Sequence, residues 1–354
     1  MFSFNIIKRL LLILILISAS LLTTHSYAAT SVSSHVIYDH AYDFSGGGVP
    51  ASSFSQDGSL FGTIALEKDS VSLRIWNTHS FTLFSALKIP NLQNFAISPD
   101  NKNLAVIMGA RQRRGLSYPY AVWIRDIHSG KTKRVLVKMG TVNAAFYSII
   151  YSHDGKYIAA DSGNSLIHVW DAAAGKQIAL FRVDGFANAI AFSPDGKKLA
   201  ALSGEYKAIP RLSVWSIAPK KLLHSVKAGY DLHSVSFSPD GKLLIVNGDK
   251  RLTQLFDAHT LKIIRQLPEG HAWDENSHTI FSPDGRYVAF TNDKYLTVRN
   301  TQNLEHIFAQ FPGFGPDWSD QKLLALHFIS SNQLIWASHS FEDTYKITLS
   351  HVTF

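Results

Sequence analysis

Aromatic residues with neighbouring carboxylates recur along the chain and are the residues best suited to binding. They lie in the segments HAYDF (His40–Phe44), DGF (Asp184–Phe186), GYD (Gly229–Asp231), HAWDEN (His271–Asn276) and GFGPDW (Gly313–Trp318). Exposed aromatic rings flanked by charge are typical of interface hot spots. We therefore predict a partner-binding set of Tyr42, Asp43, Phe186, Tyr230, Asp231, Trp273, Asp274 and Trp318. The alternative is that the rings cap the cores of their own structural units.

A basic segment extends this set. Arg111, Arg113 and Arg114 lie beside Gly115 in the longest interval between two repeats of the chain. Guanidinium groups recognise anionic groups through paired hydrogen bonds, so we include the three arginines among the partner-binding residues. The alternative interpretation is a solvated loop.

Two histidines, His278 and His327, stand at strand positions that otherwise hold small residues. A metal-binding or catalytic imidazole pair is one interpretation. The other, favoured because no acidic cluster accompanies them, is a pair of core histidines satisfied by backbone carbonyls. The sequence contains no Gly-x-Ser-x-Gly elbow, no His-Glu-x-x-His and no phosphate loop. We therefore assign no catalytic residue, metal or cofactor.

The elements that must position these residues are repeated. The pentapeptide FSPDG occurs at Phe192–Gly196, Phe237–Gly241 and Phe281–Gly285. Degenerate copies are FSQDG at Phe54–Gly58, ISPDN at Ile97–Asn101, YSHDG at Tyr151–Gly155 and FISSN at Phe328–Asn332. Successive copies are 41 to 54 residues apart. A period of this length indicates one supersecondary unit repeated seven times, and the longest step places an insertion in the second unit.

Each unit reads as four short antiparallel strands. Apolar residues alternate with small or polar ones, and Gly, Pro, Asp and Asn separate the runs. A second marker ends the third strand of most units, as in RIWN at Arg74–Asn77, HVWD at His168–Asp171 and SVWS at Ser213–Ser216. The Asp-Gly pair of the first marker supplies the positive φ that a tight turn needs.

The FSPDG turn followed by a Trp-Asp-like strand end resembles the WD-repeat β-propeller family, over residues from about 35 to 354. The resemblance implies an all-β, seven-bladed propeller, and the chain looks like a divergent, exported member of bacterial type. It also implies that His35–His40 supplies the strand missing from the last blade, so deletion of Ser34–Tyr42 should destabilise the fold. The aromatic and acidic loops would then share one face, around the mouth of the central channel.

The N-terminus reads as a secretory signal. Lys8 and Arg9 precede the apolar run Leu10–Ile17, and Ser26-Tyr27-Ala28 offers small residues for cleavage. We expect residues 1–28 to be removed, leaving one propeller domain at 29–354 that is periplasmic or secreted; an uncleaved anchor is the alternative. The chain has no cysteine, which excludes disulfides, thiol catalysis and lipid attachment through cysteine.

The charge is mildly basic. The formal net charge is +7, and removal of residues 1–28 with Lys8 and Arg9 would leave +5. We predict an exported, monomeric protein-interaction scaffold with a protein partner, no nucleic-acid partner and no membrane span after signal cleavage. The alternative function is a propeller enzyme, either a lactonase-type hydrolase or a dehydrogenase subunit, with a metal or cofactor at the channel mouth.

Overall fold

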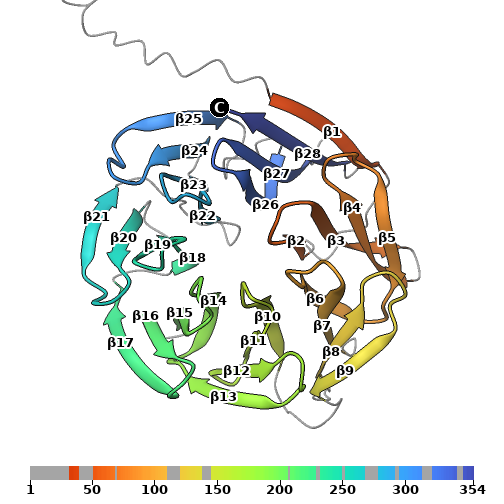
Figure 1. The fold of residues 1–354 in the computed structure, drawn as a ribbon, viewed down its shortest axis with the longest axis horizontal. Helices are drawn as coiled ribbons and strands as arrows, with labels where there is room; N and C mark the ends of the chain where they lie inside the picture. Colours follow the sequence, from red (N-terminus) through yellow and green to blue (C-terminus); the bar gives the residue numbers. More distant parts are fainter. Residues whose placement is uncertain are drawn as a thin grey trace, which may run out of the picture.

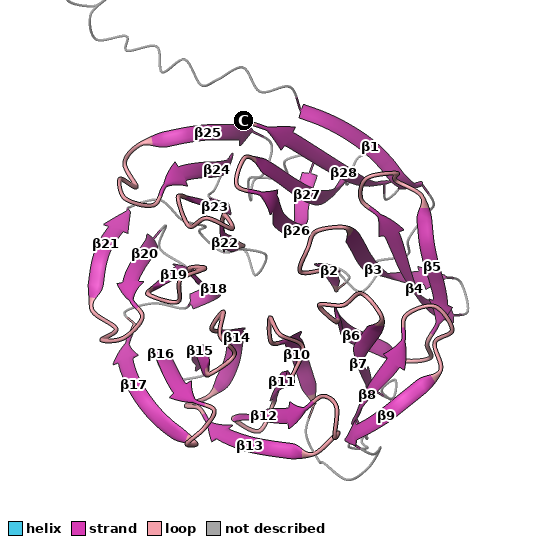
Figure 2. Ribbon diagram, viewed as in Figure 1, coloured by secondary structure: helices cyan, strands magenta, loops and turns pink. Residues whose placement is uncertain are grey.

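The fold is a ring of seven four-stranded antiparallel sheets, a seven-bladed β-propeller, as the repeat predicts (Figure 1). The structure is a computed structural model that describes residues 32–39, 51–67, 70–109, 120–137, 145–205, 208–228, 232–248, 252–267, 278–291, 295–312, 321–340 and 346–354. All regular structure in these ranges is β-strand (Figure 2), so they contain no helix long and apolar enough to cross a membrane.

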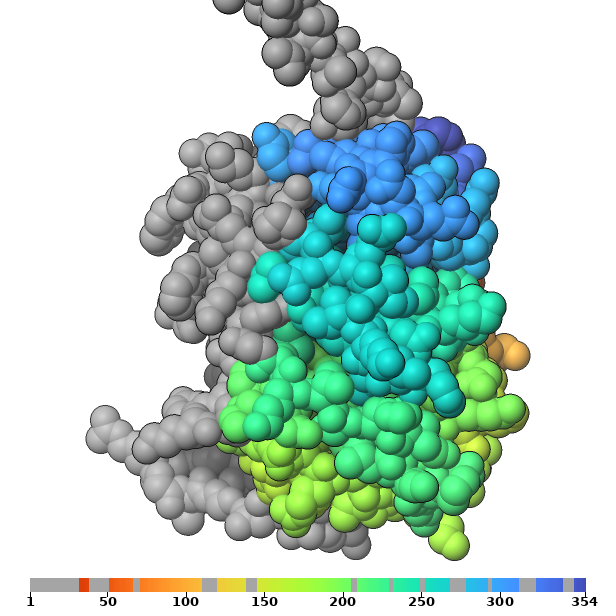
Figure 3. Space-filling view, turned by 90° about the vertical axis from the view of Figure 1, so that its left-hand side faces the viewer, coloured from red at the N-terminus to blue at the C-terminus, as the bar shows by residue number. Residues whose placement is uncertain are grey.

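The blades follow one another along the chain, and the first strand of each lies nearest the centre of the ring (Figure 1). Blades 1 to 3 comprise β2 (Ser52–Phe54), β3 (Leu60–Glu67), β4 (Ser70–Asn77), β5 (Leu83–Lys88); β6 (Leu92–Ile97), β7 (Asn103–Gly109), β8 (Tyr120–Asp126), β9 (Thr132–Val137); β10 (Phe146–Tyr151), β11 (Tyr157–Ser162), β12 (Leu166–Asp171) and β13 (Gln177–Arg182). Blades 4 and 5 comprise β14 (Phe186–Phe192), β15 (Lys198–Glu205), β16 (Ala208–Ser216), β17 (Lys221–Lys227); β18 (Leu232–Phe237), β19 (Leu243–Gly248), β20 (Leu252–Asp257) and β21 (Ile263–Leu267). Blades 6 and 7 comprise β22 (Thr279–Phe281), β23 (Tyr287–Thr291), β24 (Tyr295–Asn300), β25 (Ile307–Pro312); β26 (Gln321–Ser330), β27 (Gln333–Ser340), β28 (Lys346–Thr353) and β1 (Val32–Asp39). Seen from the side, consecutive blades lie next to one another around the wall of the ring (Figure 3).

The FSPDG motif builds the turn between the first and second strands of a blade. In blade 4, the Ser193 hydroxyl donates to Asp195 Oδ1 at 2.6 Å and accepts from the backbone N–H of Lys198 at 2.9 Å. Gly196 has a φ of 66° in this turn, a conformation that favours glycine. The same serine-to-aspartate bond recurs in the first six blades, so the pentapeptide is a self-capping turn.

The seventh copy departs from this turn. Ser330 pairs with Gln333 across a hairpin that is shorter than in the other blades, and the Ser330 hydroxyl donates to Asn332 Oδ1 at 2.8 Å. Asparagine accepts this bond in place of aspartate, so the degenerate FISSN sequence still caps its turn.

The hydrophobic core lies between adjacent blades rather than within one. Leu73 and Ile75 of blade 1 pack with Leu104 and Val106 of blade 2 in one fully buried cluster. Each such side chain contributes about 1.5–3 kcal/mol when it leaves water. Where the third-strand Trp is replaced by arginine, the guanidinium bonds the following turn instead, as Arg299 Nη1 does to the Leu304 carbonyl at 2.7 Å.

The N-terminal strand closes the ring, as predicted. β1 pairs with β28 in antiparallel register, from Val32 opposite Val352 to Asp39 opposite Lys346. The His35 ring of β1 stacks on Phe81 of blade 1 at 3.9 Å between centroids. The last blade therefore contains strands from both ends of the chain and also contacts the first blade.

Candidate functional site

One predicted partner-binding residue, Phe186, lies in the part of the chain that the structure describes. It is the first residue of β14 and is partly exposed. The other predicted residues lie outside the described ranges: Tyr42, Asp43, Arg111, Arg113, Arg114, Tyr230, Asp231, Trp273, Asp274 and Trp318.

Phe186 has an aromatic neighbour in the adjacent blade. The rings of Phe186 and Tyr147 are 6.5 Å apart between centroids and nearly perpendicular, at 81°. Tyr147 is 56% exposed. The pair bridges β10 of blade 3 and β14 of blade 4, and it is an apolar surface of the kind that interface hot spots use.

Two glycines position the pair. Gly185 has a φ of 76° immediately before Phe186, which lets the chain turn sharply into β14. At Gly163, a Cβ would lie 3.0 Å from Cε2 of Tyr147. The missing side chain at Gly163 therefore leaves room for the tyrosine ring beside the turn between β11 and β12.

Charged groups border the pair. Asp184, two residues before Phe186, lies with Oδ2 3.8 Å from Arg211 Nε of β16. The same Arg211 Nε donates to the Ser225 hydroxyl at 2.8 Å, which fixes the guanidinium on the blade. The Asp184 side chain is 69% exposed, so this ion pair contributes little to stability and is available to a partner.

The aromatic pair lies on the face of the ring opposite the FSPDG turns. Tyr147 and Phe186 stand at the beginning of their strands, whereas the capped turns follow the end of the same strands. We call the surface formed by Tyr147, Asp184, Phe186 and Arg211 the aromatic surface.

The histidines His278 and His327 are in different surroundings. His327 lines a cavity on the ring axis, and His278 is not among the residues that line it. Burial lowers the pKa of His327 to about 4, although nearby Asp57 and a hydrogen bond to the backbone of Gln56 favour the charged form. His327 is thus neutral at neutral pH, with the Gln56 backbone as its hydrogen-bond partner. The described residues bring together no group of three His, Asp or Glu side chains that could hold a metal ion.

His327 also fills the junction between blades 7 and 1, which gives a testable result. Gly58 has a φ of 69°, and a Cβ there would lie 2.7 Å from His327 Cδ2. At Gly241, in the same turn with a φ of 70°, the nearest atom to a Cβ is 3.7 Å away. We expect Gly58→Ala to lower the free energy of unfolding by about 1–2 kcal/mol more than Gly241→Ala does. Both variants place alanine at a positive φ, but only Gly58→Ala also displaces the His327 imidazole. Equal losses in urea denaturation would show that His327 moves aside freely.

Comparison with known proteins agrees with the fold. No protein-family model matches the chain. Autophagy-related protein 16 from Arabidopsis thaliana is 27% identical over 234 residues, which is 64% of this chain and 43% of that protein. The likeness fits a WD-repeat family. The chain thus matches less than half the length of this curated relative.

Within the seven-bladed ring, Tyr147 is the aromatic-surface residue that sequence reasoning missed. The corresponding position, four residues before the motif aromatic, holds Gln93, Asn188 and His233 in blades 2, 4 and 5. Blades 1, 6 and 7 hold Pro50, Ser277 and Leu324 there, so a large aromatic ring at this position was the signal that could have identified Tyr147.

Proposed function

We propose that this chain is a protein-interaction scaffold that captures a protein partner through the aromatic surface. The exposed Tyr147–Phe186 pair beside the Asp184–Arg211 ion pair carries the proposal. The propeller fold and the likeness to a WD-repeat protein support it. We further propose that the predicted loop residues extend this surface: Tyr42, Asp43, Arg111, Arg113, Arg114, Tyr230, Asp231, Trp273, Asp274 and Trp318.

We also propose that the protein is exported to the periplasm or secreted, and that it works as a monomer. The basic, apolar and small-residue segments of the first 28 residues support export. Cell fractionation tests this, and retention of the whole product in the cytoplasmic fraction would contradict it.

The capture proposal is tested by a double variant. We expect Tyr147→Ala with Phe186→Ala to weaken partner capture at least about thirtyfold, because hot-spot truncations cost about 2 kcal/mol or more. The partner is first identified by affinity capture from an envelope extract with mass spectrometry, and its affinity is then measured with purified components.

Leu180→Ala is the matched control. Leu180 is 46% exposed on the outer strand β13 of blade 3, away from the aromatic surface. The control should bind the partner like the parent protein. Equal affinities for all three proteins, with unchanged melting temperatures, would contradict the proposal.

A further inference from the structure

A second surface lies on the opposite face, where the ring axis opens between the capped turns. A cavity of about 510 Å³ occupies this end of the channel, a volume within the range of small-molecule sites. A smaller cavity of about 200 Å³ adjoins it and shares Gln56, Ile150, Tyr151 and His153. We call the two together the turn-side cavity.

The repeat itself builds the lining. The third residue of the motif faces the axis in blade after blade, and in blades 4 to 6 it is proline: Pro194, Pro239 and Pro283. These pyrrolidine rings, with Ala191, Ile190 and Ile280, form an apolar wall. Such a wall suits the face of a flat apolar ring.

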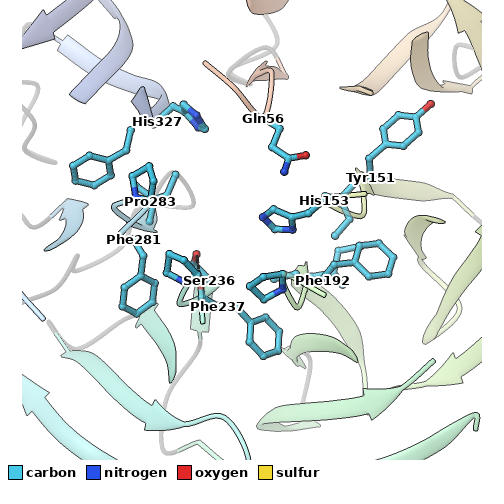
Figure 4. A pocket seen from close by; sticks show the side chains of 16 residues that line it. Gln56, Tyr151, His153, Phe192, Ser236, Phe237, Phe281, Pro283 and His327 are labelled. Atoms are coloured by element: carbon cyan, nitrogen blue, oxygen red, sulfur yellow. Dashed lines mark hydrogen bonds between the residues drawn. The ribbon is translucent and has the colours of Figure 1, made fainter. Parts of the chain in front are cut away.

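The motif departs from proline where polar groups enter the cavity. Gln56 of FSQDG and His153 of YSHDG occupy the same position in blades 1 and 3. Their side chains point into the cavity and toward one another, whereas the rings of Tyr151 and Phe192 turn away from it (Figure 4). Neither side chain hydrogen-bonds another side chain or backbone group within the described ranges.

The two polar side chains are complementary to one kind of ligand edge. A glutamine amide offers a donor and an acceptor, and so does a neutral imidazole. A carboxamide or lactam presents the matching acceptor and donor side by side. Desolvation lowers the pKa of His153 despite nearby Asp154, so its ring is neutral at neutral pH.

Charge also selects the ligand. Among the described residues, no Asp, Glu, Lys or Arg lines the larger cavity, so a fully charged ligand would lose hydration without gaining an ion pair from them. Carboxylates such as Asp57 and Asp154 directly follow the lining residues. Partial burial opposes their ionisation, but the hydrogen bonds of the turn outweigh it and lower the pKa of both groups. This rim disfavours anions in particular.

We propose that the turn-side cavity binds an uncharged planar ligand that presents a carboxamide-type edge to Gln56 and His153 and an apolar ring face to the prolines. This site is separate from the aromatic surface, which lies at the other end of the strands. It adds small-molecule binding to the proposed scaffold function.

The probe is benzamide, with benzoate and benzylamine as charged analogues of the same shape, each titrated at about pH 7.5 and followed by saturation-transfer NMR. We expect saturable binding of benzamide and binding at least about tenfold weaker for both charged analogues. Gln56→Pro and His153→Pro restore the motif of the other blades and should fold. Each should weaken benzamide binding about threefold to tenfold, the effect of one lost hydrogen bond.

Gln93→Leu is the control, because Gln93 is an exposed glutamine on β6 and does not line the cavity. Benzamide affinity should be unchanged in this variant and in the Tyr147→Ala, Phe186→Ala protein. Failure of benzamide to bind, equal binding of benzoate, or full affinity in both proline variants would each overturn the proposal. None of these results would bear on partner capture.

Discussion

Deletion of Val32–Asp39 is expected to unfold the propeller rather than shorten one blade. The strand β1 supplies seven paired positions along β28 and places His35 against Phe81 of the first blade. At about 1 kcal/mol for each lost backbone hydrogen bond, the free energy of unfolding should fall by about 4–7 kcal/mol. That is a large part of the stability of an ordinary domain. Thermal melting and urea denaturation of the deletion variant measure this loss.

Val36→Ala separates the backbone contribution from the side chain. Val36 is 54% exposed and lies within β1, opposite Thr348. Its truncation should change stability by less than about 0.5 kcal/mol because the paired backbone remains. A deletion variant that melts at the temperature of the parent protein would mean that β1 does not hold the ring closed.

The repeated part of the fold could be predicted because its determinants are local. Ser193, Asp195 and Gly196 lie within four consecutive residues and close their own turn, so the sequence carries the whole motif. The short hairpin at Ser330–Gln333 was harder to predict from the sequence. A shorter turn changes the strand register, although a serine and an asparagine still provide the polar pair of the turn. The role of Phe81 depends on blades 1 and 7 meeting in space, and local patterning carries no such information.

In the candidate sites too, the residues set by local sequence could be predicted, whereas contacts between blades could not. Phe186 was predicted because an aromatic residue followed an Asp-Gly pair, but its pairing with Tyr147 depends on two strands about 40 residues apart in sequence. In the sequence alone, Gln56 and His153 stand where the intact motif has proline and indicate only degenerate copies of it. Their position on the ring axis makes them polar groups of a cavity, because the third motif residue of each of blades 1 to 6 lines the cavities on that axis. In the sequence, the replacement of the motif proline at these two positions indicates only a degenerate repeat. In the folded ring, the same replacement places a polar group in the cavity.

Asp161 should make the protein less stable as the pH rises from about 4 to about 6. This residue of β11 is 1% exposed, and its Oδ1 accepts from the backbone N–H of Ser148 at 2.6 Å and from the Ser148 hydroxyl. Its Oδ2 has no hydrogen-bond partner among the described residues. Burial raises the pKa of Asp161 to about 6, although the Ser148 hydrogen bonds oppose the shift.

The direction of this change in stability with pH follows from the protons that the folded and unfolded chains bind. The folded chain holds the Asp161 proton more tightly than the unfolded chain, whose carboxyl has a pKa of 3.8. The contribution of Asp161 to the free energy of unfolding is therefore greatest below about pH 4, falls as the pH rises through about 6 and stays lower above it, by about 3 kcal/mol. His327 acts in the opposite sense: its folded pKa of about 4 lies below the ordinary 6.5, so its contribution is lost as the pH falls through that range. The two slopes oppose each other in the parent protein.

The Asp161→Asn variant isolates the effect of ionising this carboxylate. Asparagine keeps an oxygen for the Ser148 bonds but does not ionise, so the variant should match the parent near pH 4 and exceed it by about 2–3 kcal/mol near pH 7.5. Asp195→Asn is the control of opposite sign, because hydrogen bonds from its turn outweigh partial burial and lower the pKa of Asp195; this variant should lose stability near neutral pH. Urea denaturation across the pH range gives both differences. If the difference between parent and Asp161→Asn does not change with pH, Asp161 is ionised at no cost, and the Ser148 bonds alone satisfy its buried charge.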